Sequence, residues 1–152
     1  MTERFELVLA CDPASAAAAR AAVRQLLDER CPAQLLEDVA IVVSELVSNA
    51  VTHTGDVCVL MVQYSADQIV IEVRDTDAVR RSGEKVDRGA HDFGRGLGAV
   101  QTLSARWGIE RTDDGKTVWA EFVLPASASD QRQPIEGAPG TNHEAHRRTA
   151  DL

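Results

Sequence analysis

One long amphipathic helix is the strongest structural signal in this sequence. Between residues 35 and 53 the apolar residues recur at helical intervals, at positions 35, 36, 39, 42, 43, 46, 47, 50 and 51. This spacing gathers them into one stripe along the helix, which a globular protein buries against its core. Gly55 follows as the expected C-cap. The pattern predicts a central helix on which the rest of the chain packs.

Three polar residues of the same stretch, Glu45, Asn49 and His53, are spaced four apart. Side chains at this spacing lie one above another along a helix, here on the side away from the apolar stripe. The stack has two interpretations, the solvated face of an ordinary helix or part of a functional site. Taken alone, the spacing favours the ordinary helix.

A glycine-rich segment further along the chain favours a functional site. It consists of Gly94, Arg95, Gly96, Leu97 and Gly98, and a helical pattern follows it. A glycine-rich turn that opens a helix can hold phosphate groups on its backbone N–H groups. Asn and Glu side chains beside bound phosphates suit a metal ion and a base, and Mg²⁺ takes oxygen ligands while keeping some of its waters. The two segments together indicate a phosphate and Mg²⁺ site.

Composition and charge narrow the class of protein. The 152 residues, 44% of them hydrophobic, are enough for one domain with a sizeable core. The net charge of −8 argues against nucleic acid as a direct partner, because nucleic-acid-binding surfaces are basic. With no apolar stretch of membrane-spanning length and no signal-peptide core, we expect a cytoplasmic protein without a membrane partner. Cys11, Cys31 and Cys58 fit reduced structural thiols better than a disulfide framework or a zinc site.

The remaining elements follow from local patterns. Strands are expected where β-branched or alternating apolar residues gather, at 5–9, 57–64, 68–75, 107–111 and 117–124. Further helices are expected at 13–29 and 97–105. This order predicts an α+β two-layer sandwich with helices on one face of a mixed, mainly antiparallel sheet. Residues 76–93 are charged and without periodicity, which indicates a long loop, either a lid or a disordered segment.

The folded domain is expected to end near residue 125. Residues 126–152 contain almost no large apolar side chains, so this segment buries too little surface to order itself. The sequence therefore predicts a folded domain at 1–125 and a disordered tail at 126–152. His143 and His146 in the tail have no carboxylates around them that would favour a metal site.

Four motifs together resemble the GHKL-type ATPases, the superfamily that includes histidine-kinase catalytic domains. They are Glu45-x-x-x-Asn49-Ala50-x-x-His53, Asp75 at the end of a strand, the Gly94–Gly98 turn, and Gly115-Lys116-Thr117. The resemblance covers roughly residues 3–124. Within the superfamily the chain is most similar to small stand-alone ATP-binding regulators related to anti-sigma factor serine/threonine-protein kinases, in which Ser-Glu-Leu-Val-x-Asn-Ala is a typical motif.

The resemblance implies a role for each motif. Asn49 would bind Mg²⁺, and Glu45 would orient or deprotonate the attacking hydroxyl group. Asp75 would accept a hydrogen bond from the adenine amino group, and Thr117 would support the adenine site from the last strand. The other residues implied in binding ATP are His53 and the turn that would cradle its phosphates, Gly94, Arg95, Gly96, Leu97 and Gly98.

One segment departs from the family pattern. In the family the adenine-binding aspartate begins the run Asp-x-Gly-x-Gly, whereas here the run is Asp75-Thr76-Asp77-Ala78-Val79. Glycines let the backbone approach the nucleotide closely, and Asp77 adds bulk and negative charge near an anionic ligand. The departure leaves open how tightly ATP binds and whether kinase activity is retained.

Three classes of function stay open at this point. The leading one is a kinase that transfers phosphate from ATP to a serine or threonine of an antagonist protein and also sequesters a sigma factor. The second is a non-catalytic partner-binding module with weak or vestigial nucleotide binding. The third, a signalling ATPase or detached histidine-kinase-like domain, is disfavoured because no dimerisation helix pair with a phosphoacceptor histidine is visible. The identity of the partner and the formation of a homodimer stay open.

Overall fold

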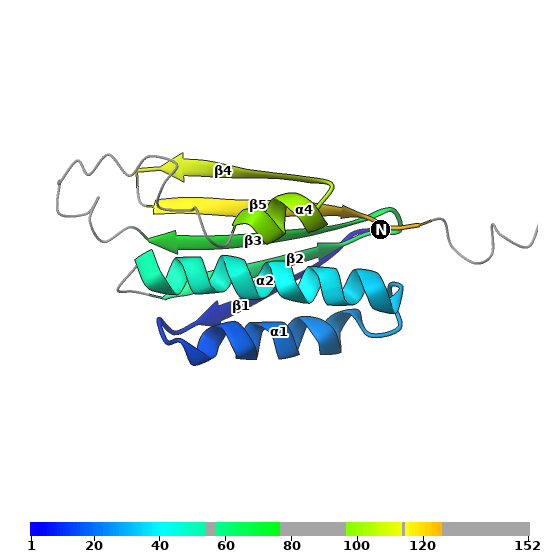
Figure 1. The fold of residues 1–152 in the computed structure, drawn as a ribbon, viewed down its shortest axis with the longest axis horizontal. Coiled ribbons are helices and arrows are strands. Elements are labelled where there is room, and N and C mark those ends of the chain that lie inside the picture. The colour runs from blue at the N-terminus through cyan, green and yellow to red at the C-terminus, as the bar shows by residue number, and fades with distance from the viewer. Residues whose placement is uncertain (54–56, 77–96, 114, 126–152) are drawn as a thin grey trace, which may run out of the picture.

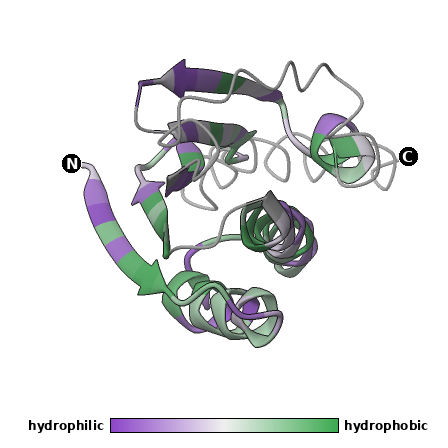
Figure 2. Cartoon of the chain, turned by 90° about the vertical axis from the view of Figure 1, so that its left-hand side faces the viewer, coloured by the Kyte–Doolittle hydropathy of each residue, from purple (hydrophilic) through white to green (hydrophobic). Residues whose placement is uncertain are grey.

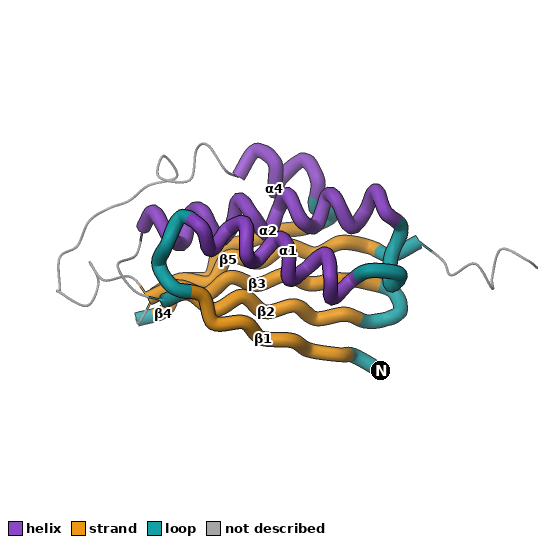
Figure 3. The backbone as a smooth tube through the Cα atoms, turned by 90° about the horizontal axis from the view of Figure 1, so that it is seen from below, coloured by secondary structure: helices purple, strands orange, loops and turns teal. Residues whose placement is uncertain are grey.

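The structure, a computed structural model, describes residues 1–53, 57–76, 97–113 and 115–125, which form an α+β two-layer sandwich (Figure 1). The elements within these residues follow one another along the chain as β1 (Glu3–Leu9), α1 (Ala14–Leu27), α2 (Ala33–His53), β2 (Cys58–Tyr64), β3 (Gln68–Thr76), α4 (Leu97–Leu103), β4 (Arg106–Thr112) and β5 (Gly115–Val123). The helices cover one side of the sheet, as the view in Figure 3 shows.

The five described strands form a single sheet in the order β1-β2-β3-β5-β4. Every neighbouring pair among them is antiparallel. At one end of the sheet the register places Cys58 opposite Asp75, and Asp75 opposite Lys116. Because successive residues of a strand point to opposite faces, residues paired across the strands share a face. Cys58, Asp75 and Lys116 therefore lie in one row, on the same face of the sheet.

The hydrophobic core lies between this face and the helices. The end-on view in Figure 2 shows hydrophobic segments on the facing sides of the two layers. The apolar stripe of α2 is buried there, and its Val39, Val42 and Val43 are fully inaccessible to solvent. Strand residues complete the core, among them Leu60, Ile69, Ile71, Val73, Val118, Ala120 and Phe122. The same face thus carries apolar rows over most of its length and the row of Cys58, Asp75 and Lys116 at one end.

Local interactions set the start of α1 and its packing on α2. The Asp12 carboxylate accepts a hydrogen bond from the Ala14 amide at 2.8 Å, which satisfies a donor at the start of the helix. Alanines give the helix a high intrinsic propensity, and buried Ala19 lets α2 approach closely. The Arg24 guanidinium joins the helices by binding both oxygens of Glu37. Among the described helices, none is both long enough and apolar enough to cross a membrane.

The fold predicted from the sequence is confirmed, with one refinement. The sheet was expected to be mixed and mainly antiparallel, and all pairs between the described strands are antiparallel. The bounds of the expected elements agree with the structure to within a few residues. The Gly55 cap, the long loop after residue 76 and the tail at 126–152 lie outside the described residues. The domain boundary and the disordered tail therefore stay predictions.

Candidate functional site

Three segments that are distant in the sequence are directed toward one end of the sandwich. The C-terminal ends of α2 and β3 lie at that end, and the N-terminal end of α4 faces it from further along the sheet (Figure 1). Helix α2 contacts both β3 and α4. These segments carry Asn49, Asp75 and the pair Leu97 and Gly98. The fold thus gathers residues from three of the four motifs at one end of the molecule.

The side chain of Asn49 has a buried polar atom, which an ordinary solvated helix face lacks. Its side-chain nitrogen, Nδ2, is buried and has no hydrogen-bond partner among the described residues. Leaving a buried amide donor unsatisfied costs about 1–3 kcal/mol, so such groups are rare in ordinary helix faces. The solvated-face interpretation of the Glu45, Asn49 and His53 stack therefore does not account for Asn49.

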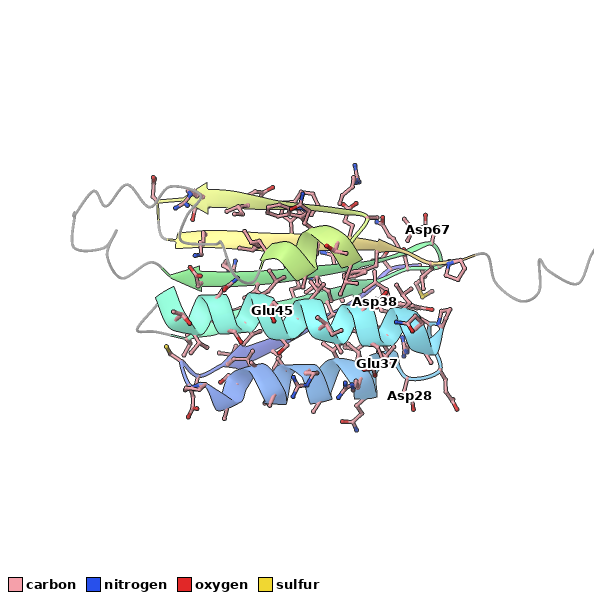
Figure 4. The ribbon with its side chains drawn as sticks, in the orientation of Figure 1. Asp28, Glu37, Asp38, Glu45 and Asp67 are labelled. Carbon is pink, nitrogen blue, oxygen red and sulfur yellow. The ribbon has the colours of Figure 1, made fainter. Side chains whose placement is uncertain are left out.

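Glu45 lies one turn before Asn49 on α2 and faces outward from the sandwich. Figure 4 shows it midway along the helix. It is half-buried and lines a shallow hollow of about 320 Å³ between α1 and α2, together with Arg20, Arg24 and Ser44. A carboxylate at this position is open to a group that approaches from outside. His53 is the last residue of α2, and its side chain lies outside the described part of the structure.

Asp75 is a buried carboxylate near the end of β3. Its residue surface is 3% exposed, and its oxygen Oδ2 lies 3.8 Å from Nζ of Lys116. The Lys116 side chain is 9% exposed, so water screens this ion pair little. A charged pair in such a position costs desolvation energy that its attraction offsets only in part. Buried charge at the end of a core row is a common feature of functional sites.

The structure places Lys116, and not Thr117, beside the carboxylate of Asp75. Thr117 pairs with Arg74 in the sheet register, so its side chain lies on the opposite face from Asp75. From that face Thr117 lines a hollow of about 530 Å³ at the same end of the sheet, with Arg74 and Asp75 among the other lining residues. The expected support of an adenine site by Thr117 stays a prediction, and the immediate neighbour of Asp75 is a cation.

The glycine turn is described only at its end. Gly94, Arg95 and Gly96 lie outside the described residues. Leu97 begins α4 and packs against the hydrophobic core, and the carbonyl of exposed Gly98 accepts a hydrogen bond from the Thr102 hydroxyl. A Cβ atom at Gly98 would meet nothing within 4 Å. Gly98 is therefore not required by packing among the described residues, and its role in cradling phosphates stays a prediction.

The thiol of Cys58 completes the buried row beside Asp75. Burial raises the pKa of Cys58 most, the negative charge of Asp75 raises it further, and Cys11 adds to the effect, while a backbone hydrogen bond opposes it. The Cys11 thiol donates to the carbonyl of Val51 at 3.3 Å, near the end of α2. The raised pKa keeps the Cys58 thiol neutral, in agreement with the expectation of a reduced structural cysteine.

The residues present fit the Mg²⁺ ion that the GHKL resemblance implies. Among the described residues, no group of three or more His, Cys, Asp or Glu side chains could hold a metal ion. The implied set is a different one, the Asn49 carbonyl oxygen with phosphate oxygens and water, which agrees with the preference of Mg²⁺ for few protein ligands. Rotation of the Asn49 amide toward a metal would break no hydrogen bond at its Nδ2 atom.

Lys116 is the site residue that sequence reasoning missed. The signal that could have found it is the alternation of β5, in which Val118, Ala120 and Phe122 all face the core. Lys116 continues this set two residues before Val118, so it faces the core as well. The family resemblance implies a role for the adjacent Thr117 instead.

Comparisons with known proteins identify the family and the fold of the chain. A family model described as a histidine kinase-like ATPase domain matches residues 9–122. No curated protein sequence matches significantly. Among the solved structures that match is the crystal structure of the RsbU and RsbW domains of Rv1364c from Mycobacterium tuberculosis, with a TM-score of 0.62 and 21% sequence identity. The match covers 82% of this chain and 33% of that one, so the chain spans about a third of its length.

Proposed function

Because the chain belongs to the histidine kinase-like ATPase family, we propose that it binds Mg²⁺-ATP at the end of the sandwich where Asn49 and Asp75 lie. We propose further that it acts as a regulatory serine/threonine-protein kinase of the anti-sigma factor type. The single observation that carries the nucleotide site is the buried, unsatisfied amide nitrogen of Asn49. It marks a polar side chain in the helix position at which the family resemblance implies an Mg²⁺ ligand.

Each part of the proposed site has a separate task. Asn49 holds the metal ion from α2, and the Gly94–Gly98 turn holds the phosphates with its backbone N–H groups. Asp75 accepts a hydrogen bond from the base. The metal ion, when bound, neutralises charge on the phosphates of ATP. Because these tasks fall to different elements, single substitutions separate them.

Glu45 is the proposed base. It lies one helical turn from Asn49 and is half-buried on the outer surface of α2, where the hydroxyl group of a second protein can approach. Its carboxylate orients that hydroxyl and accepts its proton as the phosphoryl group is transferred. The proposed phosphoacceptor is a serine or threonine of an antagonist protein, and the proposed second partner is a sigma factor, both on the strength of the Ser44-Glu45-Leu46-Val47-x-Asn49-Ala50 motif.

A second candidate function is a non-catalytic regulatory module that binds its partner and holds nucleotide weakly. Two observations favour it. The run after Asp75 has Asp77 in place of a glycine, and the Asp75 carboxylate is already paired with Lys116. Both features would weaken nucleotide binding without disturbing the fold. The two candidates differ in phosphoryl transfer and agree in partner binding.

Calorimetric titration with ATP, in the presence and absence of Mg²⁺, tests the nucleotide site. We expect the wild-type protein to bind ATP more tightly with Mg²⁺, and Asn49→Ala to lose that Mg²⁺-dependent gain while unfolding at a similar temperature. Ser48→Ala is the matched control, because Ser48 is the exposed neighbour of Asn49 on the same helix. If the wild-type protein shows no binding at millimolar ATP, the proposed nucleotide site is wrong.

Phosphoryl transfer is tested with radiolabelled ATP and a co-encoded antagonist protein. We expect Glu45→Gln to lose transfer by about 10²–10⁴-fold while ATP binding is unchanged, because a base acts in the transition state. Glu37→Gln serves as the control, since Glu37 is an exposed carboxylate of α2 paired with Arg24. Full transfer by Glu45→Gln would refute the role of Glu45, and partner binding without transfer by the wild-type protein would favour the non-catalytic module.

A further inference from the structure

The ion pair between Asp75 and Lys116 lies where the proposed function needs an open carboxylate. The two residues are register partners on the core-facing side of β3 and β5. Nζ of Lys116 lies 3.8 Å from Oδ2 of Asp75, and both side chains are at least nine-tenths buried. At this distance the contact is an ion pair and not a hydrogen bond, so Lys116 acts through its charge on the carboxylate that would meet the base.

Stability does not require an ion pair at this position, although removal of one partner alone would leave the other charge buried. The next row of the same face is apolar throughout, with Leu60, Val73 and Val118 in register and almost fully buried. An apolar pair in place of a buried ion pair is commonly neutral or stabilising, because no charge is desolvated. The buried ion pair therefore costs free energy in folding, and a role of Lys116 in ligand recognition would explain why the lysine is there.

We propose that Lys116 is a specificity-determining residue of the base site, which lowers the preference of Asp75 for a 6-amino purine. This inference rests on the proposed function, in which Asp75 meets the base. The positive charge of Lys116 offsets part of the negative charge of Asp75, and hydrogen bonds to a charged acceptor are stronger than those to a neutral one. The adenine amino group thus gains little from Asp75 while Lys116 remains. The ammonium group can instead donate to an oxygen at the same ring position, as in hypoxanthine.

The inference predicts a ratio of affinities. ATP and ITP differ at position 6 of the purine, where one carries an amino donor and the other an oxygen acceptor. We expect the wild-type protein to bind them with dissociation constants within about threefold. In Lys116→Met, no ammonium group offsets the charge of Asp75, so the amino group of ATP makes a stronger hydrogen bond to it. The oxygen of ITP loses the donor that Lys116 supplied. The preference for ATP should then rise about tenfold, since a hydrogen bond contributes roughly 0.5–1.5 kcal/mol and 1.4 kcal/mol is tenfold in affinity.

The experiment measures Mg²⁺-ATP and Mg²⁺-ITP dissociation constants for the wild-type chain and three variants. Lys116→Met removes the charge and keeps a linear side chain. Lys116→Arg keeps a charged donor, so the ratio should stay near that of the wild type. Arg111→Met is the matched control, because Arg111 is the register partner of Lys116 on β4 and is exposed. It removes the same charge one strand further from Asp75 and should leave the ratio unchanged.

The outcomes separate this inference from the proposed function. If Lys116→Met binds ATP with the wild-type ratio to ITP, the inference is overturned while ATP binding stands. If no variant and no wild-type protein binds either nucleotide, the proposed function fails and this inference with it. Circular dichroism reports whether Lys116→Met is folded. If it is not, Lys116→Gln, which keeps a neutral donor, must shift the ratio in the same direction by at least about threefold, and an unchanged ratio overturns the inference.

Discussion

Two of the ion pairs among the described residues lie at opposite ends of the sheet, and they differ in almost every respect. At the end where β2 finishes, Arg30 lies 2.5 Å from Glu3, with 37% and 45% of their side chains exposed. At the end where β2 begins, Lys116 lies 3.8 Å from Asp75, with 9% and 3% exposed. The shorter contact is the one that water reaches. Distance alone therefore does not rank the two pairs.

The difference in burial decides what each pair can do. Exposed ion pairs contribute about 0–1 kcal/mol, because water and salt screen both charges whether or not they meet. Removal of one partner from a buried pair costs about 3–5 kcal/mol, because the other charge is left in a poorly solvated place. The exposed pair joins the segment after α1 to the start of β1. The buried pair holds charge at the end of a core row, where water screens it little.

The largest effect is expected from a substitution that breaks the buried ion pair. We expect Lys116→Met to lower the free energy of unfolding by about 3 kcal/mol at neutral pH, measured by urea denaturation. The double variant Asp75→Leu with Lys116→Met should recover most of this loss, because the row then becomes apolar like its neighbours. A loss below about 1 kcal/mol in Lys116→Met would show that the pair behaves as a surface pair, and the contrast between the two ends would disappear.

The same contrast explains how far the sequence could predict the site. The helix of Asn49 and the strand of Asp75 follow from periodic patterns within each segment, and both were predicted within a few residues. The meeting of Asp75 with Lys116 depends on which residues of β3 and β5 are opposite each other. A shift of one residue would have brought Thr117 to that face instead. Local patterns locate elements, and pairing between distant strands decides which side chains lie beside one another.

The unpaired amide of Asn49 was also beyond prediction from the sequence. The four-residue spacing located the side chain on a helix face, but burial of Nδ2 depends on what packs beside α2 in three dimensions. Gly94, Arg95 and Gly96 lie outside the described residues, so their expected role in holding phosphates stays a prediction. The fold was thus predictable from periodicity, whereas the environment of each site residue required the tertiary structure.

An effect of intermediate size is expected on the pH dependence of stability, through two thiols that each lie near one of the ion pairs. Burial raises the pKa of Cys31, beside Arg30, and the pKa of Cys58 is raised by burial and then by the charges of Asp75 and Cys11. A thiol with a raised folded-state pKa contributes its stability in full below the unfolded pKa and loses it as the pH rises through the folded pKa. We expect the free energy of unfolding to fall above about pH 8.5, and to fall less in Cys58→Ala.

Urea denaturation at about pH 7 and about pH 10 measures this loss, and the ultraviolet absorbance of the thiolate reports each pKa. Cys58→Ala is compared with Cys31→Ala, which removes the thiol near the exposed pair. Asp75→Asn should lower the pKa of Cys58 toward its ordinary value and leave that of Cys31 unchanged. An equal change at both thiols would mean that the charge of Asp75 is not confined to its end of the sheet.

The smallest expected effect concerns the exposed pair. The Arg30 guanidinium lies over the Tyr64 ring at 5.5 Å and over the Phe5 ring at 6.0 Å, and the Tyr64 hydroxyl donates to the Arg30 carbonyl. Glu3→Gln should therefore cost only about 0.5 kcal/mol, since the ring contacts of Arg30 remain, and this loss should shrink further at about 1 M salt. Arg30→Lys keeps the charge and loses the planar stacking, so it should cost more than Glu3→Gln at high salt. If Glu3→Gln cost as much as Lys116→Met, exposure would not be what separates the two ends of the sheet.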